Sequence, residues 1–164
     1  LPINVVVFDI KSYRIAEKIF RNIYFLENQY FKHLEKTYFI GVNPEIDYLI
    51  LSEPIKDHLG TVDELSVIGK CVKDLKRIDS KVIISIRLHP SEKRDKYQSL
   101  INEYEDILLF ENRDLVHEIS MSKNVIGFET YALHVANHFG RKTYTLLEEI
   151  PNHLPNEIKL FWNG

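Results

Sequence analysis

Strands and helices alternate at short intervals along residues 45–164, and this alternation constrains the fold more than any other feature of the chain. Helical patterns separate five apolar runs that predict strands: Tyr48–Leu51, Val82–Ile86, Ile107–Phe110, Asn124–Gly127 and Lys142–Leu147. A helical crossover between successive strands is typical of parallel pairing. The order therefore predicts an α/β fold in which helices cover both faces of a parallel, doubly wound sheet.

Composition and charge limit the classes of protein and partner. The chain has 164 residues, enough for one domain with a sizeable core. Its net charge of −3 gives no electrostatic reason to expect a nucleic-acid partner. Cys71 is the only cysteine, which excludes an intrachain disulfide and fits a reducing compartment. No apolar run approaches the roughly 18 residues of a membrane span, and the start lacks the basic front of a signal peptide.

Residues 1–44 differ in pattern from the rest of the chain. A short strand is predicted at Val5–Phe8, and one or two helices over residues 12–36. Many aromatic residues lie between positions 13 and 31, where they form either a core or a face that docks on a partner. Asn43-Pro44 interrupts the pattern, so we expect residues 1–44 to be a connecting segment or the remnant of a preceding domain. The chain begins without Met, which suggests a fragment or a processed product.

His89 and Pro90 follow the strand predicted at Val82–Ile86. Proline fixes the backbone after the strand, so the imidazole is presented at the carboxyl end of the sheet, where such folds bind ligands. Arg87 lies two residues earlier, on the same strand face, and a guanidinium suits phosphate recognition. A histidine there can donate to a phosphate or protonate a leaving group. The alternative is a surface histidine at a turn.

The second candidate is the turn from Gly127 to Thr130. Glycine allows a ligand to approach the backbone closely, and Thr130 stands at a helix start, where free N–H groups favour an anion. The alternative is that Glu129 or Thr130 only caps the helix.

Two acidic residues are further candidates. Glu118, in the helix predicted over Asp114–Met121, is either a solvated carboxylate or an acceptor for ribose hydroxyls. Asp57 lies in a loop before Gly60 and is the preferred general base, because helix capping accounts for Asp63 and Glu64.

Metal motifs are weak in this sequence. His134 and His138 are four residues apart on one predicted helix, but the glutamate of a zinc-protease helix is missing between them. No Asp-x-Asp, P-loop or GxGxxG occurs, so we expect neither a metal nor a cofactor.

The order of these signals over Tyr48–Phe139 resembles the C-terminal, donor-binding domain of bacterial sialyltransferases with the GT-B fold, of the lipooligosaccharide sialyltransferase and capsule polysialyltransferase types. The family's proline turn and acidic, glycine-containing loop correspond to Ser52–Gly60. Its Lys-Pro-His-Pro strand end corresponds to Arg87–Pro90, and its Pro-x-Glu to Val116–Glu118. Its Gly-x-x-Ser-Ser/Thr turn corresponds to Gly127–Thr130, where Glu129 replaces a hydroxyl residue.

This resemblance implies one Rossmann-like half of a two-domain enzyme, occupying residues 45–164. Its substrates would be a nucleotide sugar such as CMP-sialic acid and a glycan acceptor, with inverting transfer. His89 would contact and protonate the departing phosphate, Asp57 would act as the base, and Glu118 would hold the ribose. The remaining donor-binding residues would be Arg87, Pro90, Gly127, Glu129 and Thr130.

Two other interpretations stay open: another GT-B enzyme that uses a UDP-sugar, as a transferase or an epimerase, and a non-catalytic Rossmann-like binding domain. The resemblance implies a cytoplasmic protein at the inner face of the bacterial membrane. Peripheral membrane association of the full-length protein and a homodimer through residues 13–31 also stay open.

Overall fold

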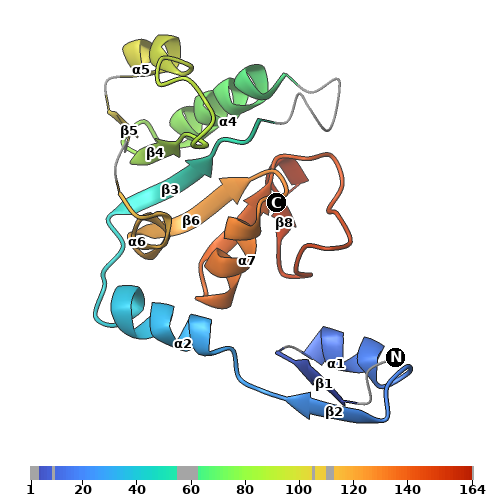
Figure 1. Ribbon diagram of the computed structural model, residues 1–164. Helices are drawn as coiled ribbons and strands as arrows, with labels where there is room; N and C mark the ends of the chain where they lie inside the picture. Colours follow the sequence, from blue (N-terminus) through green and yellow to red (C-terminus); the bar gives the residue numbers. More distant parts are fainter. Residues whose placement is uncertain (1–3, 9, 55–62, 105, 110–112, 164) are drawn as a thin grey trace. The chain divides into compact units, whose positions relative to one another are not determined.

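The computed structural model describes residues 4–8, 10–54, 63–104, 106–109 and 113–163 (Figure 1). It divides into two compact units, Leu1–Ile40 and Gly41–Gly164. The sequence pattern places a boundary slightly later, between residues 44 and 45.

The first unit is a small βαβ arrangement followed by helical turns. β1 (Asn4–Val7) and β2 (Asn22–Phe25) pair in parallel, and α1 (Ile10–Ala16) connects them. α2 (Gln29–Leu34) and a π-helical turn at Glu35–Phe39 follow. The prediction of helix throughout residues 12–36 is wrong at β2, whose Ile, Tyr and Phe side chains favour strand.

Aromatic side chains in this unit do not form a core. Tyr24, Phe25 and Tyr30 are more than half exposed, whereas Tyr13 and Phe31 are half-buried. Apolar residues exposed in this way are typical of surfaces that contact another protein. A docking face at residues 13–31 therefore stays a prediction.

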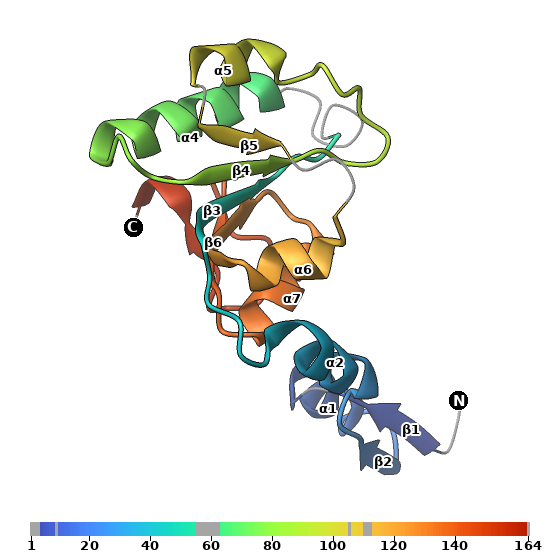
Figure 2. The ribbon, with the colours of Figure 1, turned by 90° about the vertical axis from the view of Figure 1, so that its left-hand side faces the viewer.

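The second unit contains a six-stranded parallel sheet, as predicted from the alternating pattern (Figure 2). The strand order is β5-β4-β3-β6-β7-β8, so the chain starts in the middle, builds outward to β5 and then returns to the other side of β3. The strands are β3 (Ile46–Leu51), β4 (Ile84–Arg87), β5 (Ile107–Leu109), β6 (Ser122–Gly127), β7 (Lys142–Thr145) and β8 (Lys159–Leu160).

Helices cover both faces of this sheet, which confirms the predicted fold class. α4 (Glu64–Ile78) and α5 (Gln98–Glu103) lie on one face, and α6 (Leu115–Ser120) and α7 (Tyr131–His138) on the other (Figures 1 and 2). Alternate residues of β3 serve the two layers, so that Ile50 packs in the cluster with Ile68 and Val72 of α4. A short 3₁₀ helix, Phe161–Asn163, ends the described chain.

Several predicted boundaries differ from the structure. β4 begins at Ile84 and includes Arg87, so His89 lies in the loop beyond the strand. Between β4 and β5, a series of turns leads into the short helix Gln98–Glu103. β8 was not predicted, because two residues give no periodicity to recognise. Gly140 follows the end of α7 with φ at 72°, a conformation that glycine adopts without strain.

Two glycines give a matched test of this backbone. Gly140 has positive φ, whereas Gly69 lies inside α4 with nothing within 4 Å of an added Cβ. We expect Gly140→Ala to lower the free energy of unfolding by about 1–2 kcal/mol, because alanine is strained in the left-handed region. Gly69→Ala should raise it by up to about 1 kcal/mol, because alanine favours helix. Urea denaturation measures both, and changes of the same sign would contradict this account.

Candidate functional site

The strand order creates a switch point between β3 and β6, the neighbouring strands from which the chain builds in opposite directions. In open α/β sheets, ligands bind outside the carboxyl ends of the strands at such a point. Ser52 and Glu53 follow β3, and Phe128–Thr130 follow β6. These residues therefore form the edge at which a ligand is expected.

An acidic side chain already lies at this edge. The Glu53 carboxylate accepts hydrogen bonds from three successive backbone N–H groups, those of Phe128 (2.9 Å), Glu129 (3.4 Å) and Thr130 (3.2 Å). We call these three N–H groups the anion cradle. Thr130 is the N-cap of α7 and its hydroxyl accepts from the Ala132 N–H. Thr130 therefore caps the helix, and the N–H groups of the turn bind a carboxylate of the same chain; binding of a ligand anion there stays a prediction.

The Glu53 carboxylate is closely packed and partly shielded from solvent. A Cβ added to Gly127 would lie 3.4 Å from Glu53 Oε1 and 3.2 Å from Thr130 Cγ2, so glycine is the residue that fits this close approach. Burial raises the pKa of the Glu53 carboxyl, and the three backbone hydrogen bonds offset this only in part. Phe128 is fully buried and its carbonyl accepts from Thr145 Oγ1 at 2.6 Å, which fixes the turn.

A buried polar network lies beside the cradle, made of Ser52, Glu64, Glu92, Lys96 and Tyr97. Glu64 Oε1 accepts from the Glu53 N–H (2.8 Å) and from the Tyr97 hydroxyl (2.9 Å). Lys96 forms ion pairs with Glu64 (2.5 Å) and with Glu92. The Ser52 hydroxyl lies within 2.6 Å of both carboxylates, but its one proton serves only one of them at a time.

His89 is exposed in the loop after β4, as the sequence predicts for a residue beyond the strand end. Its backbone N–H donates to Glu92 Oε2 at 2.9 Å, and its Nδ1 lies 2.7 Å from the Ser91 hydroxyl. Burial alone would raise the pKa of Glu92, but hydrogen bonds from Lys96, Ser52 and the His89 backbone outweigh it and leave that pKa lowered. An ionised Glu92 therefore anchors the His89 loop. Pro90 is exposed in the same loop.

Arg87 and Glu118 form an ion pair away from solvent. Arg87 Nη1 lies 2.9 Å from Glu118 Oε2 and also donates to the Arg113 carbonyl at 2.9 Å. Glu118 is fully buried, so the alternative of a solvated helix carboxylate is wrong. This pair could not be predicted from a local pattern, because its two members are 31 positions apart. Burial raises the pKa of Glu118, and Arg87 lowers it only in part.

The other predicted site residues are more scattered. Glu129 contributes its N–H to the cradle, while its carboxylate lies 3.9 Å from His153 Nε2. Asp57, the predicted base, lies outside the described residues. Direct contact of a ribose with Glu118 would require Arg87 to move. The binding roles of all these residues therefore stay predictions.

Sequence analysis missed the residues that organise this edge. Glu53 fell within the turn and loop at Ser52–Gly60 without being a candidate, and Glu64 was attributed to helix capping. Glu64 is instead the first residue of α4, and its carboxylate turns inward. The i,i+4 spacing of Glu92 and Lys96 was a detectable signal for an ion pair. Tyr97, the aromatic member of the same network, is fully buried.

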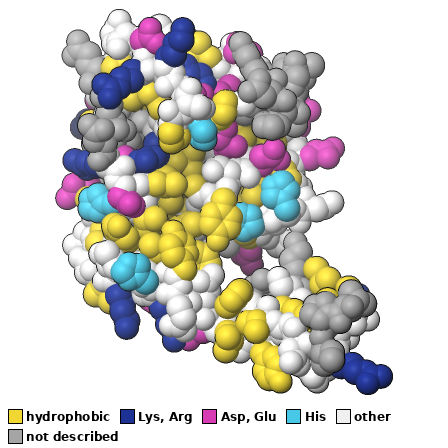
Figure 3. All heavy atoms as spheres, in the orientation of Figure 1, with side chains coloured by type: hydrophobic (Ala, Val, Ile, Leu, Met, Phe, Trp, Pro, Cys, Tyr) yellow, Lys and Arg dark blue, Asp and Glu magenta, His cyan; other side chains and the backbone are white. Residues whose placement is uncertain are grey.

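The described residues show few signs of other kinds of site. No group of three or more His, Cys, Asp or Glu side chains there could hold a metal ion. His134 stacks on Tyr131 and His138 contacts Phe139 edge-on. Among the described helices, none has the length and apolarity needed to cross a bilayer. Figure 3 shows hydrophobic side chains gathered on the face that carries α6 and α7, where Tyr131 is exposed.

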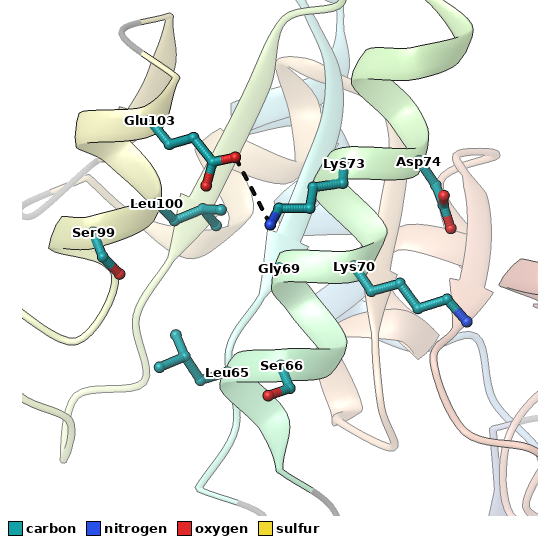
Figure 4. Close-up of a pocket in the computed structure, with 9 residues that line it drawn as sticks. All are labelled: Leu65, Ser66, Gly69, Lys70, Lys73, Asp74, Ser99, Leu100 and Glu103. Atoms are coloured by element: carbon teal, nitrogen blue, oxygen red, sulfur yellow. Dashed lines mark ion pairs between the residues drawn. The ribbon is translucent and has the colours of Figure 1, made fainter.

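A groove of about 500 Å³ runs between α4 and α5 (Figure 4). Lys73 and Glu103 form an ion pair of 3.7 Å across it, and Gly69 leaves its floor open. Both helices lie on a face of the sheet, whereas ligands of such folds bind beyond the strand ends. The switch point is therefore the stronger candidate.

No protein-family model and no curated protein matches the sequence. Solved structures do resemble the chain. A protein described as a UDP-N-acetylglucosamine 2-epimerase from Listeria monocytogenes matches with a TM-score of 0.63 and 13% identity over 85% of this chain. MnaA of S. aureus with UDP matches with a TM-score of 0.59 and 14% identity over 82%. The UDP-GlcNAc 2-epimerase of Neisseria meningitidis bound to UDP-GlcNAc gives 0.54 and 18% over 91%.

These likenesses establish the fold. The chain has the Rossmann-like α/β fold of one half of a GT-B-type enzyme. It covers 40%, 40% and 39% of the three matching chains. The sialyltransferase resemblance expected from the motifs is supported at the level of a GT-B half and not at the level of that family.

Glu118 gives a pH test of the buried pair. Because burial raises its pKa, its contribution to stability is full below the unfolded pKa and is lost as pH rises through the folded pKa. Glu118→Gln keeps the shape without the charge. We expect the stability of the wild-type protein to fall relative to this variant as pH rises. Urea denaturation between about pH 4 and pH 8 measures the difference in the free energy of unfolding between the two proteins. A constant difference across that range would contradict a raised pKa for Glu118.

Proposed function

We propose that the chain is the nucleotide-sugar-binding half of a GT-B enzyme acting on a UDP-linked sugar, as a transferase or an epimerase. In this proposal residues 45–164 bind the donor, and residues 1–44 belong to a connecting segment or to the end of a preceding domain. The observation that carries the proposal is the anion cradle at the switch point, which holds the Glu53 carboxylate. N–H groups that bind a carboxylate can bind a phosphate in the same way.

The similar structures support the choice of nucleotide. Two of them are described with UDP or UDP-GlcNAc bound, and their fold is shared over most of this chain. A diphosphate needs more than three N–H donors, and His89 is a candidate to supply another from the neighbouring loop. A CMP-linked acidic sugar is the second candidate, favoured by the order of His89-Pro90 and Gly127–Thr130 in the sequence.

Calorimetric titration of the chain with UDP, UMP and CMP tests the proposal. We expect UDP to bind more tightly than CMP, and His89→Ala to weaken UDP binding by about tenfold through the loss of one hydrogen bond to a charged group. His33→Ala is the matched control, because His33 is exposed in the first unit. Preference for CMP would favour the second candidate. If none of the three nucleotides binds, the proposal fails.

Glu53 makes a second prediction about the same cradle. A phosphate that binds the cradle must displace the Glu53 carboxylate. Breaking the hydrogen bonds of that carboxylate opposes binding and lowers the net affinity. Glu53→Gln removes the charge but keeps an oxygen that can accept from the N–H groups. We expect this variant to bind UDP about tenfold more tightly, since hydrogen bonds to a charged acceptor are roughly twice as strong as neutral ones.

The UDP affinity of Glu53→Gln distinguishes between two roles for Glu53. Weaker binding in Glu53→Gln would mean that Glu53 itself contacts the ligand and that the cradle is a structural cap. Glu129→Gln is the control, because its carboxylate lies outside the cradle while its backbone N–H is retained.

A further inference from the structure

The network beside the cradle connects loops that come from different parts of the sheet. One end of it holds the His89 loop after β4, through the His89 N–H and Glu92 Oε2. The other end holds the residue after β3, through the Glu53 N–H and Glu64 Oε1. Lys96 pairs with both carboxylates and so joins the two ends.

The charges of this network make Lys96 its critical member. Glu64 is buried, and the Glu92 side chain is only 7% exposed. Without an ammonium group between them, two buried carboxylates would repel each other and lose solvation. The Ser52 and Tyr97 hydroxyls contribute one proton each, which leaves most of the carboxylate lone pairs to Lys96 and the backbone.

Glu53 extends the connection to the third loop. Its N–H is bound by Glu64, while its own carboxylate occupies the anion cradle after β6. The loops after β4, β3 and β6 are therefore linked through one continuous set of contacts. Loops are the most mobile parts of a fold, and a ligand that contacts several of them benefits when they are held in place beforehand.

We propose that Lys96 is a positioning residue of the nucleotide site: by pairing with Glu64 and Glu92 together, it holds the His89 loop in register with the anion cradle. This inference rests on the proposed function for the identity of the ligand. The positioning itself is a property of the ligand-free protein. In this proposal Lys96 acts through the two carboxylates that it pairs with.

Lys96→Met, Lys96→Arg and the double change Glu92→Met with Lys96→Met test the inference. Replacing a buried ion pair by apolar side chains of similar size is often neutral for stability. The double variant removes the Glu92–Lys96 pair in this way, while Glu64 loses its ion pair with Lys96 but keeps its hydrogen bonds from the Glu53 N–H and the Tyr97 hydroxyl. We expect it to be less stable than the wild-type protein but folded, and the His89 N–H loses its acceptor. Lys76→Met is the matched control, because Lys76 is a mostly buried lysine that bonds to the Val82 carbonyl and Asp106, before β4 and β5.

Two measurements are made on each variant. The first is the NMR spectrum of the ligand-free protein, followed at the backbone and imidazole resonances of His89 and at the amides of Phe128–Thr130. The second is the dissociation constant for UDP. We expect the double variant and Lys96→Met to shift the His89 resonances and to weaken UDP binding by about tenfold or more. Lys96→Arg should restore both, and Lys76→Met should change neither.

The two measurements distinguish the two proposals. Unchanged His89 resonances in a folded double variant would overturn the positioning role, whatever the nucleotide does. Shifted resonances with UDP affinity equal to wild type would also overturn it. If wild-type protein binds no nucleotide while the His89 resonances shift as expected, the proposed function fails and the link between the loops stands.

Discussion

The hydrogen bonds from the β6–α7 turn to Glu53 are the interaction on which the rest of the site depends. They join the ends of the two central strands, at the point where the chain changes direction across the sheet. The three N–H groups of this turn, the last of which is at the N-cap of α7, are given a charged acceptor from the same chain. The turn and the end of β3 are thus fixed together before any ligand arrives.

This arrangement has a cost that bears on function. Burial opposes the charge of Glu53 and raises the pKa of its carboxyl. The carboxylate is partly shielded from solvent and accepts hydrogen bonds from backbone N–H groups. A bound phosphate would accept the same kind of hydrogen bond, with a larger charge and more acceptor oxygens. In the proposed function a phosphate takes the place of this carboxylate, at the edge where open α/β sheets bind their ligands.

Around Glu53 and the anion cradle, ion pairs between charged side chains connect loops and neighbouring elements. The pairing of Lys96 with Glu64 and Glu92 links the loops after β3 and β4, and the pairing of Arg87 with Glu118 joins β4 to α6 on the other side of the sheet. Both sets of contacts are shielded from water, so their loss would leave buried charges without partners. In the second unit, polar contacts thus stabilise the loops at the carboxyl edge of the sheet. The apolar cluster of β3, β4 and α4 stabilises its centre.

The sequence by itself determined the fold class of the second unit, because apolar runs and helical spacing are local patterns that survive without tertiary information. It also placed His89 beyond a strand and Thr130 at a helix start, since Pro90 and Gly127 are local signals. It could not show that Glu53 enters the cradle, 75 to 77 positions away, or that Glu118 is buried against Arg87. Those contacts join residues that only the strand order brings together, and the tertiary structure therefore decided which of several acidic residues faces the site.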